Sequence, residues 1–273
     1  MYSVSPEAAE LWRALLSAVI DAARLPVSMQ VIDHEPPAPI EALWARRDLG
    51  AVFMCGLPFS RATVQPSLLA APVPSPAEYA DRPRYWSEMV VRADGPCGSL
   101  EDTFGGRLAL TVPESQSGYA AALAHLMTVA GPSPRYREII APAVTPLGAV
   151  LAVVRGEADV APVDSYAFSL LQRFRPELTA QVRSVGRTPA TPIPALVTSP
   201  DLASLPGMES LQTAFLEAHR NAPMKALMDE LLLTRFVAPQ PAAYHTLRER
   251  HVAALTYWQE HPLAAVIHPA FVL

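Results

Sequence analysis

Hydrophobic and polar positions alternate between helical and extended periods along most of this chain. Leu11, Leu15 and Val19 recur at helical spacing after Ser5-Pro6-Glu7, which supplies a cap, a first-turn proline and an acidic residue. This pattern predicts a helix to about residue 24, followed by a strand at 27–32. The continuous apolar run at 49–54 is typical of a buried parallel strand.

The remaining elements are short and mixed. Expected strands or extended runs cover residues 68–73, 88–92, 107–112, 137–140, 159–163 and 182–186. Expected helical segments cover residues 40–46, 99–102, 117–129, 147–154, 166–173, 209–219, 224–233 and 244–258. Such alternation predicts an α/β fold with mainly parallel sheets. The two ends of the chain read as complementary parts of one domain around a central βαβαβ run.

Composition narrows the class of protein. With 273 residues, 51% of them hydrophobic, and a mean hydropathy of +0.18, the chain is too apolar for disorder. The net charge of −5 argues against a nucleic-acid-binding surface. No apolar run approaches the roughly 18 residues of a membrane span, so no membrane insertion is expected. A secretory signal begins with basic residues, but the first basic residue here is Arg13, after two glutamates. We therefore expect the chain to be cytoplasmic or to have lost its targeting signal.

The sharpest local motif is Val112-Pro113-Glu114-Ser115-Gln116-Ser117-Gly118-Tyr119, between an expected strand and an expected helix. Free N–H groups and the dipole at such a helix start favour an anion, to which serine hydroxyls would donate. The oxygens of a phosphate, phosphonate or carboxylate fit this description. The alternative is an ordinary N-cap, which the local pattern by itself favours.

Other segments also place residues suited to ligand binding at or near expected strand ends. Asp164 and Ser165 precede a helix, where open α/β sheets bind ligands, although helix capping is the simpler role for the aspartate. Gly56 after Cys55 permits close approach of the backbone. The Tyr85 ring either forms an aromatic wall for a ligand or is buried in the core.

No metal or catalytic constellation accompanies these segments. The seven histidines form no HExxH or paired spacing, and Cys55 and Cys97 form no metal-ligand spacing. No histidine lies near Cys55 in sequence to act as its base. No catalytic residue, metal or cofactor is therefore expected, and whether the two cysteines pair stays open.

Taken in order, these segments resemble the phosphate/phosphonate branch of ABC-transporter solute-binding proteins. The series includes Cys55-Gly56-Leu57-Pro58, Tyr85-Trp86-Ser87, the Ser115–Tyr119 helix start, Gly156-Glu157-Ala158-Asp159 and Asp164-Ser165, and it covers roughly residues 1–200. The resemblance implies a type II periplasmic-binding-protein fold: two α/β lobes, two hinge crossovers and a ligand closed between the lobes. Lobe 1 is expected from residues 1–88 and 193–273, and lobe 2 from 89–192.

The resemblance also implies a set of ligand-binding residues. Ser115, Gln116 and Ser117 would bind the anionic group, with Gly118 and Tyr119 in the same helix start. Asp164, with Ser165, matches the family's Asp-Ser motif, Tyr85 matches a cleft tyrosine, and Cys55-Gly56 matches a loop after a strand of the other lobe. The family's first strand ends in a segment like Met1-Tyr2, which adds Tyr2, and here that strand is nearly absent, as if trimmed.

One departure from the family bears on the charge of the ligand, and the proline clusters bear on the stiffness of the expected hinge. Family members often carry a histidine where this chain has Thr145-Pro146-Leu147-Gly148, which allows a less charged ligand. Proline, at 29 residues, clusters before Ser87 (Pro72, Pro74, Pro76, Pro83) and before Ala195 (Pro189, Pro192, Pro194). These clusters would stiffen the approaches to two crossovers between lobes.

The expected function is therefore a non-enzymatic solute-binding protein that closes around a small anionic solute for uptake through an ABC-transporter permease, periplasmic by resemblance. The alternative is a cytoplasmic enzyme on the same fold, similar to enzymes of menaquinone or thiamine pathways. That alternative needs an acid/base pair, for which His125 or His34 near Asp164 are the candidates. A ligand-sensing domain is a third class, but no DNA-binding helix-turn-helix fits either end.

Overall fold

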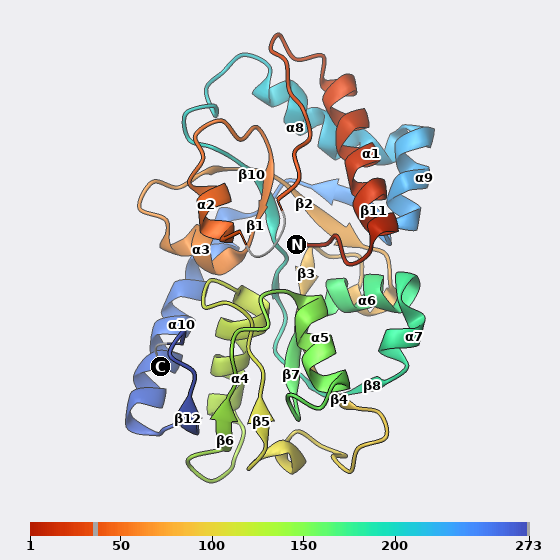
Figure 1. Ribbon diagram of the computed structural model, residues 1–273. Helices are drawn as coiled ribbons and strands as arrows, with labels where there is room; N and C mark the ends of the chain where they lie inside the picture. Colours follow the sequence, from red (N-terminus) through yellow and green to blue (C-terminus); the bar gives the residue numbers. More distant parts are fainter. Residues whose placement is uncertain (35–37, 272–273) are drawn as a thin grey trace. The chain divides into compact units, whose positions relative to one another are not determined.

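The computed structural model describes residues 1–34 and 38–271, which divide into two units. The central unit holds Tyr85–Thr191, Met1 and the chain from Thr246 onward. The outer unit holds Tyr2–Arg84 and Pro192–His245. In Figure 1 the red and orange N-terminal elements accordingly belong with the blue α8, α9 and β11, although the whole green segment separates them in sequence.

Apart from the step from Met1 to Tyr2, the chain passes between the units at three points. Two of them, Arg84/Tyr85 and Thr191/Pro192, coincide with β3 (Arg84–Tyr85) and β9 (Thr191–Pro192), which pair with each other beside the expected proline clusters. The third lies inside α10 (Pro241–Glu260) and corrects the expectation that all of 193–273 belongs to lobe 1. The reason is β12 (Ala264–Ile267), which pairs in parallel with β6 (Tyr136–Ile139) and so joins the C-terminal segment to the central unit.

The outer unit contains one antiparallel sheet in the order β1-β10-β2-β11. Its strands are β1 (Val52–Met54), β10 (Ala195–Thr198), β2 (Ser67–Pro74) and β11 (Leu233–Val237). The expected parallel strand at 49–54 is therefore wrong in direction, because Val52 lies opposite Val197 in an antiparallel ladder. A continuous apolar run shows only that a strand is buried, and its direction is set by its partner β10, which the chain forms after returning from the central unit.

Helices complete the outer unit. The first is α1 (Pro6–Ala23), whose cap is the predicted Ser5, with Oγ accepting from the N–H of Ala8 at 3.1 Å. It packs against α8 (Met208–Glu217) and α9 (Ala222–Glu230). The short helices are α2 (Ile40–Trp44), α3 (Gly56–Arg61), η1 (Ala77–Tyr79) and η4 (Ala218–Arg220).

Two expectations for the outer unit need correction. The strand expected at 27–32 is absent, and Val27 is 53% exposed, because β-rich residues form a strand only where a neighbouring strand supplies hydrogen bonds. The helix expected at 224–233 ends at Glu230, and Leu233 begins β11, which was not expected. The first four residues form no strand, yet Tyr2 and Val4 are buried.

The central unit contains two three-stranded sheets. One is antiparallel, with β7 (Ala161–Asp164), β4 (Ser87–Arg92) and β8 (Val182–Arg187) in the order β7-β4-β8. The other is parallel, with β12 and β6 followed by β5 (Arg107–Leu108). An isolated parallel bridge between Leu108 and Val160 joins the two sheets. The α/β fold class is confirmed, while the expectation of mainly parallel sheets is wrong.

Helices follow the strands of the central unit in chain order. They are η2 (Glu101–Thr103), η3 (Gln116–Ala121), α4 (Ala122–Thr128), α5 (Pro146–Val154), α6 (Ser165–Phe174) and α7 (Pro176–Thr179). The core contains Leu108, Leu123, Ile139 and Trp258. Because β5 and β7 run in the same direction, the chain leaves both strands at one edge, and η3 and α6 begin there.

Candidate solute-binding site

The carboxyl ends of β5 and β7 bring two predicted segments together. The helix formed by η3 and α4 runs without a break from Gln116 to Thr128, and η3 packs against both β4 and β7. Ser87, the first residue of β4, lies opposite Asp164, the last residue of β7. The Ser87 hydroxyl donates to the carbonyl of Ser117 at 2.7 Å. The predicted residues around Ser117 and Asp164 therefore share one edge of the central unit, where open α/β sheets bind ligands.

The helix start itself has an unusual geometry. Gln116–Ala121 forms a π-helix, and the N–H of Ala120 bonds back five residues to the carbonyl of Ser115 at 3.1 Å. The wider turn leaves one more N–H group without a helical acceptor than an α-helix would, and π-turns recur at functional sites. Ser115 caps the turn, because its Oγ accepts from the N–H of Gly118 at 3.0 Å. The capping alternative for Ser115 is thus realised, in a turn whose N–H groups and dipole still suit an anion.

Two buried polar atoms at this turn have no hydrogen-bond partner among the described residues. They are Oε1 of Gln116 and Oγ1 of Thr111, in residues that are each 3% exposed. The N–H of Thr111 donates to the carbonyl of Gly118 at 3.0 Å, which fixes Thr111 against the helix start. A Cβ on Gly118 would lie 2.1 Å from the Thr111 hydroxyl oxygen, so only glycine fits there. An unpaired buried polar atom costs free energy, so a partner at this turn would stabilise the structure.

Asp164 and Ser165 connect the second strand end to Trp86. The N–H of Ser165 donates to the Trp86 carbonyl at 2.9 Å, and Oγ of Ser165 accepts from the Trp86 N–H at 3.2 Å. Asp164 caps α6, with Oδ1 accepting from the N–H of Ala167 at 2.9 Å. The capping role considered for Asp164 is therefore present, on a side chain that is 3% exposed. Tyr85, at the entry to the central unit, is fully buried.

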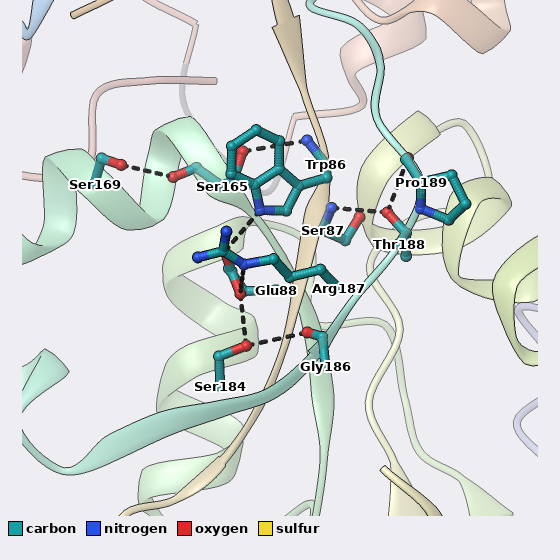
Figure 2. Close-up of polar contacts among 10 residues, drawn as sticks. All are labelled: Trp86, Ser87, Glu88, Ser165, Ser169, Ser184, Gly186, Arg187, Thr188 and Pro189. Atoms are coloured by element: carbon teal, nitrogen blue, oxygen red, sulfur yellow. Dashed lines mark hydrogen bonds and ion pairs between the residues drawn. The ribbon is translucent and has the colours of Figure 1, made fainter. Parts of the chain in front are cut away.

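A buried carboxylate holds Trp86 in place (Figure 2). Glu88 accepts from Nε1 of Trp86 at 2.7 Å, from the Ser184 hydroxyl at 2.5 Å and from Nε of Arg187 at 2.9 Å. The Arg187 guanidinium lies over the Trp86 ring, 5.1 Å from its centroid. The Thr188 hydroxyl accepts from the N–H of Ser87 at 2.9 Å. This network joins β4 to β8 directly beside the residues that enter and leave the central unit.

The remaining predicted residues divide between the core and the outer unit. The Tyr119 ring stacks on Phe271 with centroids 5.6 Å apart and is 2% exposed, so it supports the helix start from the core side. Tyr2 belongs to the outer unit, where its ring packs against Trp12 and Phe53. Cys55 and Gly56, at the N-terminus of α3, also belong to that unit.

The outer unit has a cavity of about 250 Å³ that none of the predicted residues lines. Its walls are mainly apolar and come from α2, β1, α3 and the end of β10, including Trp44, Met54 and Val197. Ser199, also in the lining, already bonds to the carbonyl of Arg46 and the N–H of Leu49. This hollow therefore offers few polar groups to orient a charged solute.

The remaining observations on the described residues concern metal ligands, thiols, the pKa of one histidine and membrane-spanning helices. Residues 1–34 and 38–271 hold no cluster of three or more potential metal-ligating side chains. Cys97 is a half-buried free thiol, and Cys55 is buried. Burial lowers the pKa of His125, on α4, and the Glu101 carboxylate opposes that shift. No helix among the described residues has the length and apolarity to cross a bilayer.

Sequence reasoning missed several residues at this edge. Ser87, Thr111 and Thr188 are ordinary strand-end or loop residues in sequence, and only the fold places their hydroxyls beside the helix start. Glu88 was expected only as the first residue of a strand at 88–92, with no role at the site. The one signal available was Gly118, because a glycine in a helix start indicates close approach by another segment.

The model of one protein family matches most of the chain. It is described as "ABC transporter, phosphonate, periplasmic substrate-binding protein" and matches residues 4–244. Comparison with curated proteins gave no match.

Several solved structures share the fold. A binding-protein component of an ABC phosphonate transporter from Pseudomonas aeruginosa is 18% identical, with a TM-score of 0.73, covering 94% of this chain and 85% of its own. PhnD1 from Prochlorococcus marinus, in complex with methylphosphonate, is 17% identical, with a TM-score of 0.70 and coverages of 92% and 93%. A Xanthomonas citri protein bound to chloride ion is 19% identical, with a TM-score of 0.63 and coverages of 94% and 96%. The predicted type II fold is thereby confirmed.

Proposed function

Because the chain belongs to the phosphonate ABC-transporter family of periplasmic substrate-binding proteins and is a solute-binding protein, we propose that its ligand is a small phosphonate- or phosphate-like oxyanion bound at the edge of the central unit. The binding residues would be Ser115, Gln116 and Ser117 at the helix start, with Asp164 and Ser165 at the neighbouring strand end. Tyr2, Cys55, Gly56 and Tyr85 remain proposed members of the site.

The observation that carries this proposal is the unsatisfied helix start. The π-turn presents N–H groups at the positive end of a helix dipole, which stabilises negative charge. The hydroxyls of Ser115 and Ser117 flank Gln116, and the buried Thr111 hydroxyl, which can donate, has no partner among the described residues. A tetrahedral oxyanion offers several oxygens at once and so could satisfy donors that converge from one turn.

Members of this family are the substrate-binding components of ABC transporters. The transporter partner and the compartment of this chain are therefore part of the proposal. The partner would be an ABC-transporter permease, and the compartment would be the periplasm. No catalytic role is proposed, since Ser115 and Asp164 cap helices and the carbonyl of Ser117 accepts from Ser87.

Isothermal titration calorimetry with methylphosphonate and inorganic phosphate tests this function. Wild-type protein should bind at least one of them, and Ser117→Ala should weaken that binding by about tenfold or more, since a hydrogen bond to a charged group is worth about 1.5–3 kcal/mol. Ser133→Ala is the matched control, because that exposed hydroxyl donates to the Pro262 carbonyl in the same unit and should leave binding unchanged. Failure of the wild type to bind either anion would overturn the proposal.

A further inference from the structure

One helix belongs to both units of the chain. α10 runs from Pro241 to Glu260, 20 residues without a break, and the boundary between the units falls inside it, between His245 and Thr246. By contrast, β3 and β9, which carry two other connections between the units, are short extended strands. After Pro241 the helix contains no proline or glycine, the residues at which helices most often kink. This connection is therefore much stiffer than the other two.

The first turns of α10 are anchored in the outer unit. The Tyr244 hydroxyl donates to the Ile193 carbonyl at 2.9 Å, and its ring makes a T-shaped contact with Phe59, with centroids 5.5 Å apart. Tyr244 is 2% exposed, and burial raises the pKa of its hydroxyl, which therefore stays a neutral donor. Ile193 directly follows β9, so this bond ties the helix to the chain beside another connection between the units.

The later turns of α10 are anchored in the central unit, on the helix that begins at the candidate site. Nε1 of Trp258 donates to the Leu123 carbonyl, in α4, at 3.1 Å. The Trp258 ring is buried, and the Arg135 guanidinium lies over it, 5.5 Å from the ring centroid. The His251 ring lies against that of Tyr119, in η3, with centroids 5.7 Å apart. These contacts tie α10 to both parts of the helix whose start we assign to the ligand.

We propose that α10 is a strut between the two units, which restricts how far they separate when no ligand is bound. The inference rests on the proposed function and on hinge movement of the units around a bound solute. A continuous helix that is held in each unit by a buried hydrogen bond resists bending at the boundary, because a sharp bend breaks main-chain hydrogen bonds. Restricting the ligand-free ensemble lowers the conformational cost of closure and so raises affinity.

A pair of matched glycine substitutions tests the strut. Thr246 and Thr256 are both exposed threonines of α10, the first at the boundary between the units and the second inside the central unit, between the buried Ala254 and Trp258. Thr246→Gly and Thr256→Gly make the same change in the same helix, so their cost in helix propensity is similar. Only Thr246→Gly loosens the helix between the anchors of the two units. Thr246→Ala, which keeps the helix stiff, is a second control.

Small-angle X-ray scattering without ligand measures the separation of the units. Thr246→Gly should have a larger radius of gyration than the wild type at unchanged far-UV circular dichroism, while Thr256→Gly and Thr246→Ala should match the wild type. Saturation with methylphosphonate should bring all four proteins to one value. In calorimetry, Thr246→Gly alone should bind methylphosphonate about threefold or more weakly, because the apparent Kd rises as the binding-competent fraction falls.

The outcomes separate the strut from the function on which it rests. A radius of gyration of ligand-free Thr246→Gly no larger than that of the wild type, or an equal increase in Thr256→Gly, would overturn the strut even if every variant bound methylphosphonate. Failure of the wild type to bind methylphosphonate or inorganic phosphate would overturn the proposed function, and the ligand-free comparison would still decide whether α10 restrains the units.

Discussion

The Ser87 hydroxyl donates a 2.7 Å hydrogen bond to the main-chain carbonyl of Ser117, and this one contact fixes the start of β4 against the helix start that we assign to the ligand. Both residues are buried, at 0% and 6% exposure. A carbonyl inside the first turn normally points along the helix, so an outside donor fixes the turn's orientation as well as its position.

Replacing Ser87 with alanine should therefore affect stability and binding together. We expect Ser87→Ala to lower the free energy of unfolding by about 1–2 kcal/mol, because a buried carbonyl loses its side-chain donor. Methylphosphonate affinity should fall several-fold. Urea denaturation and calorimetry measure the two effects. Ser60→Ala, which removes a hydroxyl bonded to the Leu57 carbonyl in the outer unit, should change stability without changing affinity.

Gly118 and Thr111 form a second test of the helix start. Gly118→Ala should destabilise the protein by about 1–3 kcal/mol, because the new Cβ would lie 2.1 Å from Oγ1 and 2.6 Å from Cγ2 of Thr111. Thr111→Ala removes both of those atoms, so the double variant should lose less stability than the two single losses combined. A double-mutant cycle by urea denaturation gives the coupling energy. Strict additivity would show that the two residues do not compete for this space.

The Glu88 carboxylate should contribute more to stability than its arginine partner. Glu88→Ala removes the acceptor for three donors and should cost about 3 kcal/mol of unfolding free energy. Arg187→Ala should cost about 1 kcal/mol, since the arginine side chain is 53% exposed while that of Glu88 is 5% exposed. Glu177→Ala, which breaks an exposed pair with Arg175, is the control and should change stability little. Equal costs for Glu88→Ala and Arg187→Ala would contradict this ranking.

His125 should give the protein a specific loss of stability in acid. Burial lowers its pKa in the folded state below the ordinary value of 6.5, so the unfolded chain takes up a proton first as the pH falls. His125 has no effect on the pH dependence of stability above about pH 7. As the pH falls from 6.5 through the folded-state pKa, proton uptake by His125 in the unfolded chain progressively destabilises the fold.

The measurement is the change in Tm between about pH 8 and pH 5.5. His125→Gln should show a smaller decrease in Tm over this interval than the wild type, because glutamine does not titrate. Thr128→Ala, which removes an exposed hydroxyl that donates to the His125 carbonyl, is a control without a titrating group and should follow the wild-type profile. A His125→Gln decrease as large as that of the wild type would show that other groups carry the acid sensitivity.

Features that depend on local sequence were predicted well. Ser5 and Pro6 begin α1, Ser115 begins the helix at 116, and Asp164 caps α6, because a cap needs only an oxygen within three residues of an N–H. The order of strand ends and motifs was enough to identify the family and its type II fold.

Features that depend on partners distant in sequence could not be predicted from local patterns. The direction of β1 against β10, the existence of β11 and β12, and the return of the C-terminal segment to the central unit follow from pairing between strands that no local pattern specifies. The same cause explains the lost strand at 27–32, which found no partner.

The candidate site shows this division most clearly. The local pattern predicted a helix start at residues 115–119, and the helix begins there, at Gln116. Only the fold determined that Thr111 lies against Gly118, that Ser87 holds Ser117, and that Gln116 buries an acceptor without a partner among the described residues. These relationships depend on β5, β4 and β7 meeting at one sheet edge, because a side chain's burial and hydrogen bonds are set by neighbours that the chain brings from elsewhere.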